Sequence, residues 1–110
     1  METIDDLQKK FEYYAEQQYI AFSEGGGRKA NIWHKKIMKL YEMCQTLKCT
    51  DMFRTFLFHE NENVRLWAAG FCRNEFPKES MKVLKKLLRS SEPIISLSAK
   101  FLLEPFNKKE

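Results

Sequence analysis

The chain has 110 residues, of which 44% are hydrophobic, 14% aromatic and 31% charged, and its formal net charge is +4. A chain of this length can bury one modest core, so we expect a single domain over residues 1–110. The aromatic content argues against intrinsic disorder, and no apolar run approaches the ~20 residues that a membrane-spanning helix needs. Residues 1–20 carry acidic side chains in place of an apolar signal region, so we expect a cytoplasmic protein.

Two long helices are predicted in the first part of the chain. Apolar residues recur every three or four positions over residues 3–23, with Thr3 as the N-cap. The glycines at 25–27 predict a turn, and a second helix is expected over residues 29–47. A short third helix then carries Met52, Phe53, Phe56 and Leu57.

Three further helices are predicted in the rest of the chain. The first starts near Asn63 and is apolar almost all round, so it is expected between other elements. Pro77 and Pro93 suit the first turns of the next two. The last helix is expected to end at Pro105. No segment alternates as a strand, and the predicted fold class is all-α with about six helices in antiparallel pairs. The expected buried stripes are Met81, Val83, Leu84, Leu87 and Leu88, and then Ile94, Leu97, Phe101 and Leu102.

The second half of the sequence contains an internal repeat. Residues 57–71 align with residues 87–101 at an offset of 30, which pairs Val64 with Ile94 and Trp67 with Leu97. Such a repeat predicts two helical hairpins, stacked so that each covers the apolar face of the other.

The string from Leu57 to Ala69 resembles the turn and second helix of a HEAT repeat, in which an Asn- or Asp-rich turn precedes Val-Arg and two small residues. With the Ala30-Asn31 step, most of residues 5–105 is similar to a family of small bacterial HEAT-like proteins of unknown function. The resemblance implies a HEAT- or armadillo-like α-α superhelix fragment. Some relatives resemble immunity proteins that neutralise a cognate toxin, which implies a non-enzymatic protein-binding role. In the second copy, Ile95 stands opposite Arg65.

Candidate partner-binding residues lie in and after the Val-Arg-Leu-Trp block. Trp and Arg are enriched at the energetic hot spots of interfaces. For Trp67, packing between helices is favoured over partner binding, because the repeat pairs it with Leu97. Leu66 is expected to border a groove, and the protein to be a monomer or weak dimer. The candidates are Arg65, Leu66, Trp67 and Arg73.

The positive charge is concentrated in two stretches, residues 28–50 and 77–110. Basic residues most often form a solvated helix face, but they also suit the phosphates of nucleic acid. Nucleic-acid binding is therefore the alternative function. It would use Lys35, Lys39, Lys82, Lys85, Lys86 and Arg89.

No catalytic, cofactor or metal site is predicted. His34 and His59 are the only histidines, and neither has partners at a familiar ligand spacing. The three cysteines are expected to be reduced: Cys44 and Cys72 fall on apolar stripes, and Cys49 is expected to be more exposed.

Overall fold

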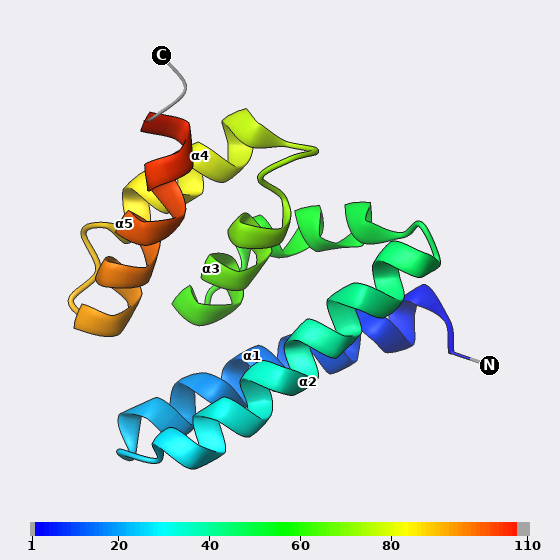
Figure 1. Ribbon diagram of the computed structural model, residues 1–110, viewed down its shortest axis with the longest axis horizontal. Helices are drawn as coiled ribbons and strands as arrows, with labels where there is room; N and C mark the ends of the chain where they lie inside the picture. The colour runs from blue at the N-terminus through cyan, green and yellow to red at the C-terminus, as the bar shows by residue number, and fades with distance from the viewer. Residues whose placement is uncertain (1, 108–110) are drawn as a thin grey trace. The chain divides into compact units, whose positions relative to one another are not determined.

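The structure is a computed structural model that describes residues 2–107. Over this range the chain is helical and has no strand, which confirms the predicted all-α class. No described helix is both long enough and apolar enough to cross a membrane. The elements in chain order, shown in Figure 1, are α1 (Ile4–Ser23), α2 (Gly27–Thr46), the 3-10 helix η1 (Thr50–Phe58), α3 (Glu62–Phe71), α4 (Pro77–Leu87) and α5 (Pro93–Asn107).

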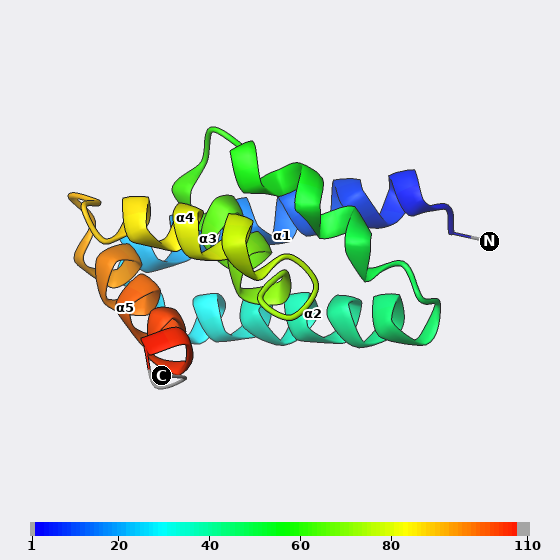
Figure 2. The same ribbon diagram turned by 90° about the horizontal axis from the view of Figure 1, so that it is seen from above.

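The chain divides into two compact units between Met52 and Phe53. The first unit is built on an antiparallel hairpin of α1 and α2, which lie side by side in Figures 1 and 2. The ring of Trp33 on α2 lies 5.7 Å, between centroids, from the rings of both Tyr13 and Tyr14 on α1. The buried residues of the two helices include Leu7, Phe11, Ala15, Ala30, Ile37, Leu40 and Cys44.

The predicted N-cap and the glycine turn are confirmed. The Thr3 hydroxyl accepts a hydrogen bond from the backbone N–H of Asp6, and the Asp6 carboxylate accepts one from the backbone N–H of Thr3. This reciprocal capping box satisfies donors that a helix start leaves without partners. Gly25 has φ +74°, a conformation that glycine adopts without steric cost, and the turn allows α2 to begin at Gly27.

The second unit contains α3, α4 and α5. Asn61 caps α3, because its side-chain oxygen accepts hydrogen bonds from the backbone N–H groups of Asn63 and Val64. As predicted, α3 is largely enclosed: it packs against α4 and α5, and Val64, Leu66, Ala68 and Ala69 are buried. Pro77 occupies the first turn of α4, also as predicted. The buried residues of α4 are Ser80, Leu84 and Leu87, whereas Leu88 is 40% exposed.

The predicted buried face of α5 is wrong. Ile94, Leu97 and Phe101 are 40%, 56% and 68% exposed. The buried face instead carries Ile95, Ala99 and Leu103, and Leu102 is half-buried. Because α5 has apolar residues on both faces, its periodicity alone could not decide which face packs inward.

Pro105 does not end α5, which continues to Asn107. A proline lacks the N–H that would bond to the carbonyl four residues earlier, here that of Phe101. Its fixed φ is itself helical, so a proline so near the end of a helix interrupts one bond without stopping the helix.

The helix starts differ by one residue from the offset of the sequence repeat. Helices α3 and α5 begin at Glu62 and Pro93, which are 31 residues apart, whereas the sequences align at an offset of 30. At an offset of 31, buried Val64 and Ala68 correspond to buried Ile95 and Ala99, but buried Leu66 corresponds to Leu97, which is 56% exposed. The burial of the two helices therefore matches over only part of their length.

Candidate protein-binding surface

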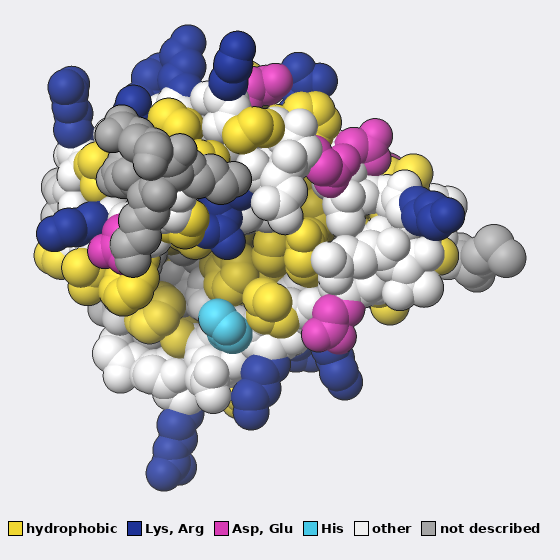
Figure 3. All heavy atoms as spheres, turned by 45° about the horizontal axis from the view of Figure 1, so that its top comes forward, with side chains coloured by type: hydrophobic (Ala, Val, Ile, Leu, Met, Phe, Trp, Pro, Cys, Tyr) yellow, Lys and Arg dark blue, Asp and Glu magenta, His cyan; other side chains and the backbone are white. Residues whose placement is uncertain are grey.

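Three apolar side chains form a stripe along the exposed side of α5. Ile94, Leu97 and Phe101, which we call the α5 stripe, follow each other at intervals of three and four residues. That spacing places side chains on one helical face. In the space-filling view of Figure 3, hydrophobic side chains reach the surface among Lys and Arg side chains. Contiguous exposed apolar surface is typical of interaction sites.

Arg65 and Trp67 are both half-buried. An Nη atom of Arg65 lies 3.9 Å from a carboxylate oxygen of Glu62, and its Nε is buried with no hydrogen-bond partner among the described residues. The Trp67 ring lies 5.5 Å from that of Phe71, which in turn lies 4.9 Å from that of Phe53. The Trp67 ring therefore packs on a neighbouring aromatic ring and keeps part of its surface exposed.

The other two predicted partner-binding residues are less available. Leu66 is only 7% exposed, so little of its side chain could meet a partner. Arg73 is half-buried, and its Nε donates a hydrogen bond of 3.1 Å to the carbonyl of Gly70. Each residue of the α5 stripe, which its helical spacing predicted to be buried, is therefore more exposed as a fraction than any of the four predicted binding residues.

The six basic residues predicted for nucleic-acid binding are all exposed. Lys35 and Lys39 lie one turn apart on α2, in the first unit. The other four belong to the second unit. None of the six makes an ion pair with another described residue. We call Lys82, Lys85, Lys86 and Arg89 the α4 basic face.

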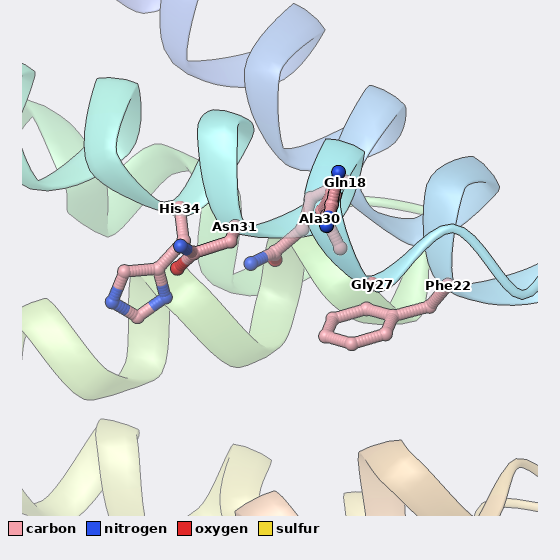
Figure 4. Close-up of a pocket in the computed structure, with 7 residues that line it drawn as sticks. Gln18, Phe22, Gly27, Ala30, Asn31 and His34 are labelled. Atoms are coloured by element: carbon pink, nitrogen blue, oxygen red, sulfur yellow. The ribbon is translucent and has the colours of Figure 1, made fainter.

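A shallow pocket of about 460 Å³ lies on the α1–α2 hairpin. In Figure 4 the rings of Phe22 and His34 and the side chain of Asn31 project from the same side of the hairpin. Most of the lining is exposed, so a ligand there would stay largely hydrated. The lining residues are Gln18, Phe22, Gly27, Arg28, Ala30, Asn31 and His34.

The histidines take no part in a cluster of metal-binding type. Among residues 2–107, no group of three or more His, Cys, Asp or Glu side chains is arranged to hold a metal ion. His59 lies in the turn before α3, where its Nδ1 accepts a hydrogen bond from the backbone N–H of Asn61. This hydrogen bond indicates that His59 has a structural role in the turn. His34 is exposed on α2.

All three cysteines are buried and reduced. Cys49, expected to be more exposed, is only 6% exposed. Burial is the main reason why the pKa of Cys44 and that of Cys72 are each raised to about 12. A thiol held protonated in this way is a poor nucleophile at neutral pH.

Comparison of the chain with protein-family models, with curated proteins and with solved structures gives no match.

Proposed function

We propose that this protein is a non-enzymatic protein-binding helical module whose partner packs on the α5 stripe. The observation that carries the proposal is the 56% and 68% exposure of Leu97 and Phe101 on one helical face. Burying a large apolar side chain contributes about 1.5–3 kcal/mol, so two or three such residues can anchor a complex.

The net positive charge of the segment that contains α4 and α5 favours a partner with an acidic surface. Residues 77–110 carry eight basic and four acidic side chains. Complementary charge raises the rate of association and excludes partners of like charge. The partner that best fits this surface has an apolar groove or patch bordered by carboxylates.

Toxin neutralisation is the most specific form of the proposal. It follows from the resemblance to small HEAT-like proteins, some of which resemble immunity proteins. The partner would then be a toxin encoded beside this protein and blocked by occlusion of its active site.

Co-expression with the products of adjacent genes tests this function. We expect one product to co-purify with the wild type and to be lost with the double variant Leu97→Ser, Phe101→Ser. The matched control is Phe58→Ser, which removes an aromatic side chain that is 78% exposed in η1. Equal loss in both variants, or retention in the double variant, would refute a role for the stripe. If no product co-purifies and none of the products is toxic, the immunity form is wrong.

Nucleic-acid binding is the second candidate, and the α4 basic face supports it. Four exposed cations that form no ion pair with the residues the structure describes are available for phosphates, and such binding weakens steeply as salt rises. The double variant Lys82→Glu, Lys85→Glu should abolish binding to duplex and single-stranded DNA and RNA, and Lys35→Glu, Lys39→Glu tests the first unit in the same way. Unchanged binding in both variants would exclude these surfaces.

A further inference from the structure

Three sulfur atoms are gathered at the end of α2, within the first unit. Cys44, Cys49 and Met52 are 0%, 6% and 6% exposed. The Cys44 thiol donates a hydrogen bond to Sδ of Met52, with 4.0 Å between the sulfurs. The Cys49 side chain lies within interaction range of the same thiol. Cys44 is thus close to both of the other sulfur side chains.

The backbone explains why the two cysteines meet. The N–H of Cys49 donates to the carbonyl of Cys44 at 2.9 Å, and the N–H of Lys48 donates to that of Gln45 at 3.2 Å. Lys48 has φ +57°, and Leu47 is the C-cap. These are the two hydrogen bonds of a Schellman motif, which commonly brings the side chains at the positions of Cys44 and Cys49 into contact.

The start of η1 brings in the third sulfur. The N–H of Met52 donates to the carbonyl of Cys49 at 3.1 Å, so Met52 follows Cys49 by one tight turn. Residues 44–52 therefore hold the whole cluster, and no distant part of the chain is needed to assemble it. The sequence spacing hides the cluster because the cysteines do not form a CxxC pair and because a methionine is not an obvious ligand.

We propose that Cys44, Cys49 and Met52 form a binding site for a monovalent soft metal ion, copper(I). Thiolate and thioether sulfurs are the ligands that select Cu(I), whereas structural zinc takes four ligands from Cys, His and carboxylates. Three sulfurs around an ion at a metal–sulfur distance of about 2.3 Å lie about 4 Å apart. The separation of the Cys44 and Met52 sulfurs matches that spacing.

When Cu(I) binds, it replaces the protons of the Cys44 and Cys49 thiols. Cu(I) forms one bond to each thiolate and one to the neutral thioether, and both thiol protons pass to solvent, with no change in oxidation state. The ion replaces the hydrogen bond that now joins Cys44 and Met52.

The test is an anaerobic titration of the whole reduced protein with Cu(I), in competition with a chromogenic Cu(I) chelator such as bicinchoninate. Ag(I), which does not change oxidation state, serves as a second probe. We expect one equivalent to be withheld from the chelator and a thiolate-to-copper charge-transfer band to appear in the ultraviolet. If the wild type withholds no copper, the proposal is wrong.

Variants locate the ion. Removing even an outer partner of a metal ligand typically costs about 10–100-fold in affinity, so Cys49→Ala and Met52→Leu should each weaken binding at least tenfold. Cys72→Ala is the control, because Cys72 lies in the second unit and should bind as the wild type does. Circular dichroism establishes that each variant is helical. Wild-type affinity in Cys49→Ala, or equal loss in Cys72→Ala, would overturn the assignment.

Discussion

The hydroxyl of Ser80 on α4 donates a buried hydrogen bond to the backbone carbonyl of Ala69 on α3, with 2.5 Å between the oxygens. Ser80 is fully buried in an otherwise apolar face. The bond lets a small polar side chain stand where the two helices pack, because the hydroxyl finds its partner on the other helix.

Replacing Ser80 by Ala should lower the free energy of unfolding by about 1–2 kcal/mol, the usual cost of a lost buried hydrogen bond. Chemical denaturation measures this. The control is Ser96→Ala, which removes an exposed bond of 3.0 Å to the carbonyl of Leu88 and should cost less than about 0.5 kcal/mol. Equal losses of unfolding free energy in the two variants would show that the buried hydrogen bond between α3 and α4 stabilises the protein no more than the exposed one does.

Two adjacent isoleucines test which face of α5 is buried. Ile95 is 1% exposed and Ile94 is 40% exposed. Ile95→Ala should cost about 2–4 kcal/mol because it leaves a cavity, whereas Ile94→Ala should change stability by no more than about 0.5 kcal/mol. Both variants replace Ile by Ala in the same turn of α5, so the change in helix propensity is the same. A difference in stability between them therefore reports the difference in burial. A larger loss of stability in Ile94→Ala than in Ile95→Ala would support the buried face predicted from the sequence.

The free energy of unfolding should fall in alkaline solution because the buried thiol of Cys72 resists ionisation. Burial, reinforced by the nearby carboxylates of Glu75 and Glu79, raises its pKa from 9.0 to about 12. The folded state therefore keeps a proton that the unfolded state releases, so the contribution is complete below pH 9 and is lost as the pH rises toward 12. Urea unfolding of Cys72→Ala should show a shallower decline over this range. Parallel curves for the two proteins would contradict the buried thiol.

The capping box at the start of α1 should make the stability of the protein depend on pH in acid. Hydrogen bonds from the backbone and side chain of Thr3 lower the pKa of Asp6 below its ordinary 3.8. Its contribution is present above that value and is lost as the pH falls through the lowered pKa. In Asp6→Asn, the loss of stability that comes from protonation of the Asp6 carboxylate should disappear. In Asp5→Asn, which keeps the capping box, this loss should remain. Unfolding curves between pH 2 and 5 distinguish the two.

Capping and turn residues correctly predicted where helices begin, whereas the end predicted at Pro105 was wrong. Thr3, the glycine turn and Pro77 act through bonds or steric limits within a few residues, so their effects are visible in the sequence. The face of α5 was predicted wrongly because both of its sides are apolar, and only packing against α3 and α4 decides between them.

The candidate surfaces were harder to predict for the same reason. Phe101 was predicted to be buried because it is a large apolar residue at helical spacing, yet it is 68% exposed. The contact of Cys44 with Cys49 depends on the left-handed conformation of Lys48, which lysine rarely adopts and which its identity does not indicate. The exposure of the six basic residues, in contrast, follows from their charge alone.

Packing of a protein partner on the α5 stripe can be detected by site-specific photocrosslinking. Benzoylphenylalanine is placed at Leu97 in one variant and at Lys82 in another, and each variant is co-expressed with the partner identified by co-purification. We expect a covalent adduct with the partner from position 97 and none from position 82. An adduct from position 82 alone would show that the partner binds the α4 basic face and not the stripe.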